Sequence, residues 1–367
     1  MAINSRYALM DRRSFIAGAG SLFLSTLNGQ AAENLDKSEL LFASCIKRSD
    51  GRFNAVILNG DADLIAEVAL PDRGHAVVFD ANSNRAVAFA RRPGNFALVF
   101  SVDGYEPPRN IVAEEGRHFY GHGVFSPKGD LLFASENDFE TSTGKIGIYD
   151  ATNQFKRLGE FDSFGIGPHE ILLLNDGKTL AIANGGIETH PDFGRAKLNL
   201  STMKPSLAFI DIKTGDLIEK HTLDLNRLSI RHLAATSTGG VIFGCQFQGS
   251  KSDTPPLVGR CDLGKGISLW PLTADKSFAN YTGSLATSKD GTHVAVSSPK
   301  GSVVKIFKTE NGQAVKTFKM AGSAGVARIG GGFIASSERG MVKAIGDNKP
   351  DRQMPFLFDN HLTRMVR

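Results

Sequence analysis

The fold is decided by two stretches of sequence, HFYGHGVFSPKGDLLFASENDFETSTGKIGIYD (118–150) and GIGPHEILLLNDGKTLAIANGGIETHPDFGRAKLNLSTMKPSLAFID (165–211). Each has a β-prone segment that contains a histidine, then a tight turn, an apolar segment ending on a small or polar residue, and a third β-prone segment. Such apolar segments occur seven times in the 367 residues and end at Ser44, Arg91, Ser135, Asn184, Cys245, Ser298 and Ser337. Strand units that recur about every 40–60 residues are typical of a propeller. We predict an all-β, seven-bladed β-propeller over residues 33–367.

The start of each repeat predicts how the propeller closes. A short β-prone segment precedes six of the seven apolar segments, and it begins near His75, His122, His169, His232, Ser284 and Gly325. The seventh such segment lies at the C-terminus, at His361, and the N-terminal copy has none before it. We therefore expect N- and C-terminal strands to complete one blade together, which removes open sheet edges.

Composition agrees with a single turn-rich β domain. The chain has 40 glycines and a formal charge of only +4, with no block of Lys or Arg, so no nucleic-acid partner is expected. Three cysteines are too few for a disulfide framework. We expect buried free thiols, although a bridge between Cys245 and Cys261 is conceivable.

The N-terminus has a pattern of its own. Asp11-Arg12-Arg13-Ser14-Phe15-Ile16 precedes a short apolar run and the small residues near Ala31. This resembles a twin-arginine export signal over residues 1–32. The run is too short to span a bilayer, so we expect a periplasmic protein without a membrane span after cleavage.

Histidines provide the clearest functional signal. Five of the nine in the chain occupy the same position of their repeats: His75, His122, His169, His232 and His361. Innermost strands line the channel of a propeller, so these side chains are expected to form a partial ring at one rim. The sequence leaves three interpretations open: ligands for iron, copper or zinc, hydrogen bonding within each blade as in WD-repeat propellers, or binding of an anionic organic ligand.

Other polar side chains are expected near the same rim. The candidates for ligand binding or for supporting the metal are Arg92, Glu136, Glu170, Asn184, Glu188, His190 and Arg195. Three of them belong to the longest insertion, residues 185–205, which begins at the rim and can fold over it. Among the metal ligands, we favour His122, His169 and His232 because they lie on consecutive blades, with Glu136 and Glu188 as the supporting acids.

Nearly the whole chain after the signal, and the PHE and NGGIETHPDFGR stretches in particular, resemble a bacterial exported family classed as domain of unknown function 1513. The resemblance implies a periplasmic seven-bladed propeller. It also implies genes near those of imelysin-like iron-uptake proteins and a di-haem oxidoreductase-like protein, which suggests iron or copper handling. It supplies no catalytic residues.

These observations predict a periplasmic binding protein for a transition metal or metal complex, with imelysin-type proteins as possible partners. The alternatives are a metal-dependent hydrolase of the lactonase type and a protein–protein interaction scaffold. No nucleophile elbow, haem site, zinc-protease motif or phosphate loop is present, so the chain is more consistent with a non-enzyme. A lactonase arrangement would use Glu136, Glu170, Asn184 and Glu338 around a metal.

Overall fold

The protein is described by a computed structural model that covers residues 40–346 and 349–365. Residues 1–32, the expected export signal, lie outside the described residues. Within the described part of the chain, no helix is long and apolar enough to cross a membrane.

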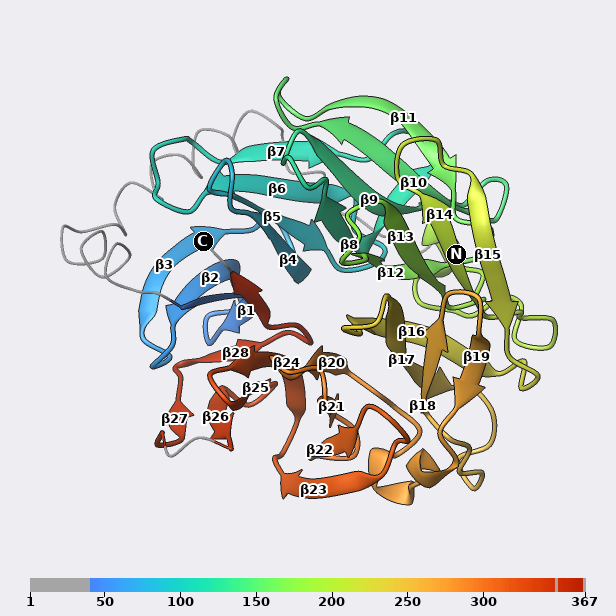
Figure 1. The fold of residues 1–367 in the computed structure, drawn as a ribbon. Helices are drawn as coiled ribbons and strands as arrows, with labels where there is room; N and C mark the ends of the chain where they lie inside the picture. Colours follow the sequence, from blue (N-terminus) through green and yellow to red (C-terminus); the bar gives the residue numbers. More distant parts are fainter. Residues whose placement is uncertain (1–39, 347–348, 366–367) are drawn as a thin grey trace, which may run out of the picture.

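Seven antiparallel sheets surround a central channel, so the predicted seven-bladed propeller is confirmed (Figure 1). Strands are given from the channel outward. The first blade has β28 (Phe356–Phe358) and β29 (Thr363–Met365), β1 (Leu41–Arg48), β2 (Phe53–Asn59) and β3 (Leu64–Ala69). The second has β4 (Gly74–Asp80), β5 (Arg85–Ala90), β6 (Phe96–Ser101) and β7 (Arg109–Val112). The third has β8 (Arg117–Phe125), β9 (Leu131–Asp138), β10 (Thr143–Asp150) and β11 (Lys156–Asp162).

The remaining blades repeat this order. The fourth has β12 (Pro168–Leu173), β13 (Thr179–Asn184), β14 (Ser206–Asp211) and β15 (Leu217–Thr222). The fifth has β16 (Leu228–Ala235), β17 (Gly240–Phe247), β18 (Val258–Asp262) and β19 (Gly266–Leu269). The sixth has β20 (Ser284–Thr287), β21 (His293–Ser298), β22 (Val303–Lys308) and β23 (Ala314–Lys319). The seventh has β24 (Ser323–Ile329), β25 (Gly332–Ser337), β26 (Met341–Ile345) and β27 (Arg352–Gln353). Short 3-10 turns are η1 (Pro191–Phe193), η2 (Pro271–Thr273) and η3 (Lys276–Phe278).

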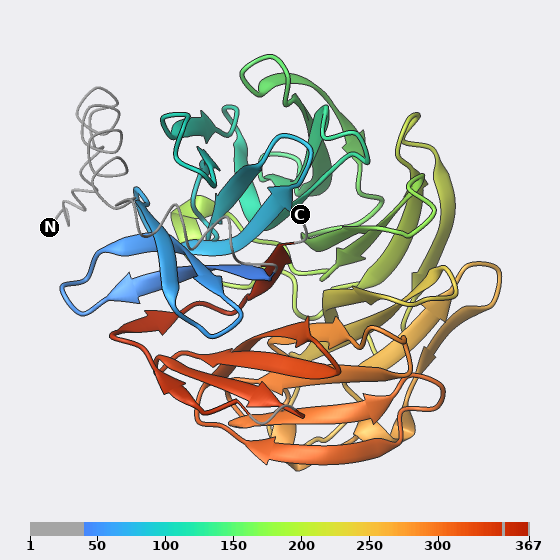
Figure 2. The same ribbon diagram turned by 60° about the vertical axis from the view of Figure 1, so that its left-hand side comes forward.

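The two ends of the chain share the first blade, as predicted. β28 and β29 both pair with β1, and Figure 2 shows the red C-terminal strands beside the blue N-terminal ones. The hydroxyl of Ser44 donates to the carbonyl of His361 at 2.6 Å, and the amide of Asp359 donates to the carbonyl of Cys45 at 2.8 Å. Closure therefore fixes the C-terminal segment against the channel.

Second strands explain why the repeat is visible in the sequence. β13 is buried at all six positions and β5 at its last five, because neighbouring blades pack against both faces of each sheet. A strand covered on both sides has no polar face, so it appears as an uninterrupted apolar run. The expected three strands per repeat are present, but every blade also has an outer fourth strand. These outer strands were missed because they face solvent, as in β15 and β23, whose residues are mostly exposed.

The three cysteines are buried free thiols, so the bridge between Cys245 and Cys261 is not formed. Cys45 and Cys245 lie in second strands and Cys261 in a third strand, and all three pack into the apolar clusters between blades. Burial raises the pKa of each thiol, so they behave as small apolar side chains.

Candidate metal centre

The innermost strands change register where the histidines occur. The shift lies between Gly74 and Val77 in β4, and the corresponding shifts are in β8, β12 and β16. His361 falls between β28 and β29, opposite the middle of β1. A β-bulge bends its strand and redirects a side chain, so the bulges turn the imidazoles of these four strands toward the channel.

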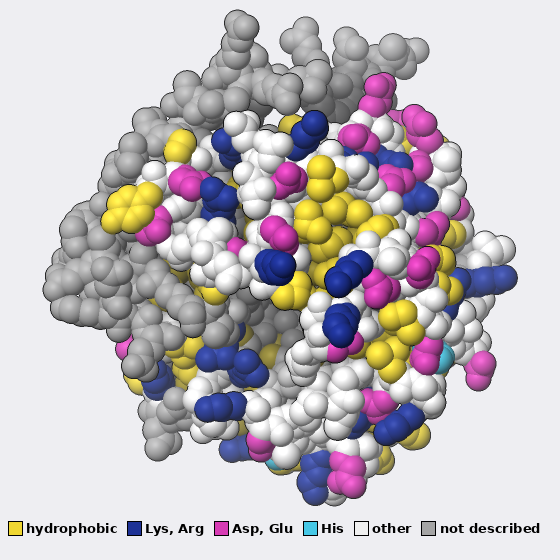
Figure 3. Space-filling model, turned by 45° about the horizontal axis from the view of Figure 1, so that its top comes forward, with side chains coloured by type: hydrophobic (Ala, Val, Ile, Leu, Met, Phe, Trp, Pro, Cys, Tyr) yellow, Lys and Arg dark blue, Asp and Glu magenta, His cyan; other side chains and the backbone are white. Residues whose placement is uncertain are grey.

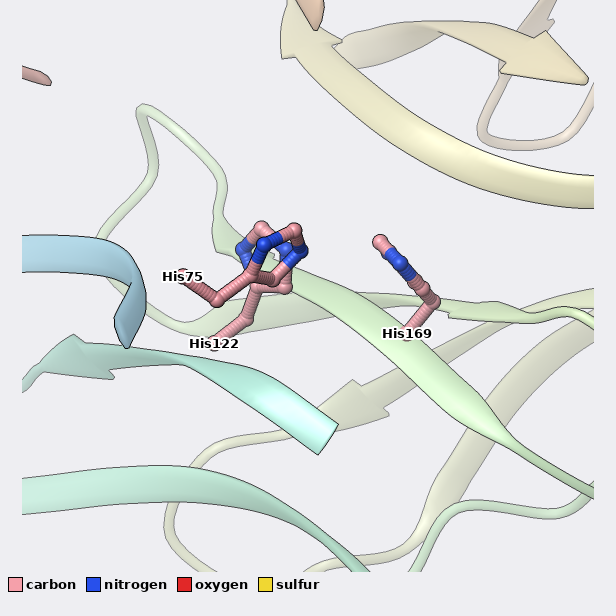
Figure 4. A group of neighbouring side chains, drawn as sticks. All are labelled: His75, His122 and His169. Atoms are coloured by element: carbon pink, nitrogen blue, oxygen red, sulfur yellow. The ribbon is translucent and has the colours of Figure 1, made fainter. Parts of the chain in front are cut away.

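The five imidazoles meet inside the channel. We call His75, His122, His169, His232 and His361 the histidine cluster. Ring centroids within it lie 4.5 Å apart for His122 and His361, 5.0 Å for His169 and His232, and 6.4 Å for His122 and His232. Figure 4 shows the rings of His75 and His122 side by side and that of His169 turned toward them. The residues form a compact group across the channel, where the sequence predicted a partial ring along its rim.

Two sets of three ring nitrogens are close enough to share one ion. In each set, one nitrogen from every member lies within 4.8 Å of the others. The sets are His75, His122 and His169, and His122, His232 and His361. His122 belongs to both. The favoured trio on consecutive blades, His122, His169 and His232, is neither set, because side chains that cross the channel approach each other as closely as those on adjacent blades.

Hydrogen bonds from neighbouring blades orient three of the rings. Nδ1 of His75 lies 3.0 Å from Oδ1 of Asp359, and Nδ1 of His169 lies 3.2 Å from the carbonyl oxygen of Arg231. Nδ1 of His232 lies 3.2 Å from Oε2 of Glu170. All three bonds cross between blades, so hydrogen bonding within one blade, as in WD repeats, does not account for these rings. Contacts at Nδ1 leave Nε2 directed into the cluster, as in metal sites with an ordered second shell.

Three ring nitrogens are buried without a hydrogen-bond partner: Nε2 of His122, of His232 and of His361. They come from one of the two sets. Buried polar atoms are normally satisfied, and an exception needs an explanation such as a missing ion. Burial lowers the pKa of all five imidazoles, and neighbouring positive charges lower it further. The rings are therefore neutral at pH 7, the state in which imidazole binds a metal.

Asp359 is a buried carboxylate beside the cluster. Burial by itself would raise the pKa of Asp359, but the hydrogen bond with His75 and the charges of Arg91 and Arg73 outweigh burial and hold the pKa well below its usual range. Its carboxylate lies 2.6 Å from Nη1 of Arg91 and 2.7 Å from Nε of Arg73. Asp359 thus stays ionised and accepts a hydrogen bond from Nδ1–H of His75.

Glu170 has the opposite behaviour. Burial raises its pKa to about 8, and the backbone amide of Leu233 only partly offsets this effect. It is therefore largely protonated at neutral pH. Its carboxyl contacts His232, so it lies directly behind the cluster.

A cavity of about 890 Å³ adjoins the cluster, and His75 and His169 form part of its wall. Eight of its lining residues are basic: Arg91, Arg92, Arg195, Lys197, Arg231, Lys251, Lys276 and Lys300. No Asp or Glu lines it among the described residues. By contrast, acidic and basic side chains are mixed over the outer face in Figure 3, where few histidines are visible.

Two of the predicted ligand-binding residues line this cavity, Arg92 and Arg195, and Nη1 of Arg195 donates to the carbonyl of Arg92 at 3.2 Å. The 185–205 loop therefore reaches from the fourth blade to the second. Glu136 is occupied within its own blade, where it accepts from Tyr149 at 2.5 Å and from Arg157 at 2.9 Å.

Three further candidates have local roles. Asn184 is fully buried and donates to the carbonyl of Ser163 at 2.8 Å. Glu188 accepts from Ser142 at 3.0 Å, and His190 caps η1 through its ring nitrogen. Successive residues of a strand point to opposite faces of its sheet, so the ends of second strands mostly project between blades and not into the channel. The lactonase arrangement around Glu136 and Asn184 is therefore not assembled, and Glu338 is exposed and does not line the cavity.

The sequence reasoning missed Asp359 and four of the lysines. Asp359 precedes His361 by two residues in the same irregular segment. The basic residues had a clearer signal. Arg92, Lys197, Lys251 and Lys300 all lie in the loop between the second and third strands of their blades, and all four line the cavity.

The chain belongs to the family described as "Protein of unknown function (DUF1513)", whose model matches residues 68–365. No curated protein sequence matches it. Among solved structures it is similar to hydrazine synthase from Kuenenia stuttgartiensis, with a TM-score of 0.65 and 15% identity over 83% of this chain and 95% of that one. At this identity the similarity shows the fold alone.

Proposed function

From this family membership and the converging imidazoles, we propose that the protein binds a transition-metal ion in the channel of its propeller. The observation that carries the proposal is the set of three unpartnered, buried Nε2 atoms on His122, His232 and His361. A group of neutral nitrogen donors without a carboxylate among them suits copper, zinc or iron(II) better than calcium or magnesium.

The distances are compatible with loading by small movements. Metal–nitrogen bonds of about 2.0–2.1 Å place nitrogens roughly 3.3 Å apart in a tetrahedral site. The members of each set already lie within 4.8 Å of one another. A change of rotamer or a shift of less than about 2 Å would therefore bring three donors to one ion, and the shared His122 makes the two sets alternatives for a single metal.

The remaining residues support the ligands. The Glu170 carboxyl can accept a hydrogen bond from Nδ1–H of His232, and the Asp359 carboxylate accepts one from Nδ1–H of His75. Such partners fix the ring orientation and increase the basicity of the coordinating nitrogen.

We further propose that the protein is exported by the twin-arginine route and acts in the periplasm, in iron or copper acquisition beside imelysin-type proteins. The support is the Arg12-Arg13 motif and the family resemblance. Export of a folded protein is compatible with a metal site assembled from five distant repeats.

Elemental analysis tests the proposal. The protein is purified without chelators or a metal-affinity tag, and compared with His122→Gln, which removes the shared ligand from both sets. One metal per chain in the wild type and none in the folded variant are expected. His75→Gln and His361→Gln, each of which affects one set, identify the set that holds the ion.

His293→Gln is the matched control, because His293 begins β21 and lines a different pocket, which includes no residue of the cluster. Failure of the wild type to bind copper, zinc or iron(II) after anaerobic reconstitution would overturn the proposal. Equal loss of metal in the His293 variant would show that binding does not depend on the cluster.

A further inference from the structure

Within the described part of the chain, the cavity is lined by basic residues and by no acidic ones, and binding of a metal ion by the histidine cluster does not explain this excess of positive charge. Of its eight basic residues, Arg91 is ion-paired with Asp359. None of the other seven forms an ion pair with a carboxylate in the described residues. A metal cation is repelled by such a lining, so the lining requires a different explanation.

The buried guanidinium groups are also incompletely hydrogen-bonded. Arg231 is only 8% exposed, and its Nε has no hydrogen-bond partner. Nη1 of Arg92 is also buried without a hydrogen-bond partner. Leaving a charged donor unsatisfied in the interior is costly. Both arginines line the cavity, where a ligand oxygen can satisfy them.

The cations lie close enough to affect one another. Burial, together with the charges of Arg92 and Arg195, lowers the pKa of Arg231 to about 10. Burial and the charges of Arg231 and Lys300 likewise lower the pKa of Lys197. Like charges held together without a counterion destabilise the empty cavity, and a bound anion relieves that repulsion.

The arrangement is built by the fold. Four blades contribute a cation from the loop between their second and third strands: Arg92, Lys197, Lys251 and Lys300. Arg231 comes instead from β16, next to His232 of the histidine cluster. The positive charge therefore extends from the mouth of the channel down to the imidazoles.

We infer that this cavity binds a small anion that carries two or more carboxylate or phosphate groups. Guanidinium groups bind such oxyanions through paired N–H donors, and lysines add positive charge. A cavity of about 890 Å³ has ample room for a di- or tricarboxylate. His75 and His169 in its wall place the anion beside the imidazoles. The inference of an anion site depends only on the basic residues of the cavity. A role of the anion as a co-ligand of the metal would rest on the proposed function.

Isothermal titration calorimetry with citrate and with pyrophosphate tests the inference. The protein is metal-free, so chelation by either probe contributes nothing to the heat. We expect saturable binding that weakens with ionic strength, and the ratio of the two affinities identifies the preferred oxyanion. Arg231→Met is expected to weaken binding by about tenfold or more, because one charge-assisted contact is lost.

A loop variant protects the test against misfolding. Arg195→Ala combined with Lys197→Ala changes two exposed side chains of the 185–205 loop and leaves every blade intact. It should weaken binding by a similar factor. Arg109→Ala, on the exposed outer strand β7, is the control and should bind as the wild type does.

Two results would overturn the inference: no binding of either anion to the wild type, or equal affinities in the wild type, the loop variant and Arg231→Met. The His122→Gln variant separates the two sites. It should lose the metal and keep the anion, so failure of the metal proposal does not imply failure of this one.

Discussion

Nδ1 of His75 lies 3.0 Å from Oδ1 of Asp359, and this contact joins the innermost strand of the second blade to the C-terminal segment that closes the first. The same carboxylate pairs with Arg91 and Arg73. Closure of the propeller and orientation of a candidate metal ligand therefore depend on one buried side chain.

Asp359→Ala should destabilise the fold by about 3 kcal/mol, because it leaves the largely buried Arg91 without its counter-charge. Urea unfolding measures this loss. Metal affinity should also fall, by about 10-fold or more, since His75 loses its orienting partner. Asp351→Ala, which removes an exposed ion pair with Lys343, is the control and should cost less than about 1 kcal/mol. Similar losses in both variants would contradict the role assigned to Asp359.

Gly121→Ala should disturb the cluster directly. Gly121 has φ +102°, and a Cβ there would lie 2.5 Å from Cδ2 of His75. The ring would have to move, so we expect reduced metal content as well as lower stability. Gly51 also has positive φ, +92°, but has open space around its missing Cβ. Gly51→Ala therefore measures backbone strain alone. Wild-type metal content in the Gly121 variant would show that the position of the His75 ring is unimportant for binding.

Stability should fall as the pH decreases through the histidine range. Burial lowers the pKa of His118 to about 4, and the charges of Arg92 and His190 act in the same direction against the hydrogen bond to the carbonyl of Phe119. In the unfolded chain, the pKa of the His118 side chain is the ordinary histidine value of about 6.5. Between these values the unfolded state holds the extra proton, so stability is full above about 6.5 and is lost as the pH falls toward 4.

The measurement is urea unfolding of metal-free protein across this pH range. His118 contributes up to about 3 kcal/mol to the change. His118→Gln should therefore show a shallower pH dependence than the wild type. An unchanged slope would mean that His118 is not buried in its neutral form.

Metal should stabilise the folded protein by an amount that grows with the logarithm of its free concentration relative to Kd. At a free concentration about 100 times Kd, a ligand specific for the folded state adds about 2.7 kcal/mol. We expect a rise in Tm with zinc or copper for the wild type and for His293→Gln, and no rise for His122→Gln. A rise in all three proteins would indicate binding outside the cluster.

Export should depend on the paired arginines. Arg12→Lys combined with Arg13→Lys is expected to retain the protein in the cytoplasm of a host with a twin-arginine translocase, as measured by cell fractionation. Arg6→Lys, outside the motif, should be exported normally. Periplasmic accumulation of the double variant would refute the twin-arginine route.

Much of the architecture could be predicted from the sequence because a propeller is built from local units. The strand that ends at Asn184 is buried along its whole length because neighbouring blades cover both of its faces, and its sequence is therefore a nearly uninterrupted apolar run. The outer strand β23 lacks such an apolar run, because it is mostly exposed. The site was less predictable. Ser135 and Glu136 are adjacent in β9, so their side chains point to opposite faces of the sheet. This direction places the Glu136 carboxylate against Tyr149 and Arg157 inside the blade.

The sequence by itself determined the seven repeats, the sharing of one blade by the two chain ends, and the recurrence of a histidine at five blade starts. Those properties follow from short-range strand patterns and from counting repeats. Only the tertiary structure decided that the rings meet across the channel with His122 in both sets, that Asp359 supports His75, and that the mouth collects unpaired cations. The physical reason is that distances across the channel depend on closure of all seven blades and on how the bulges in β4, β8, β12 and β16 turn their histidines relative to one another, which no single repeat determines.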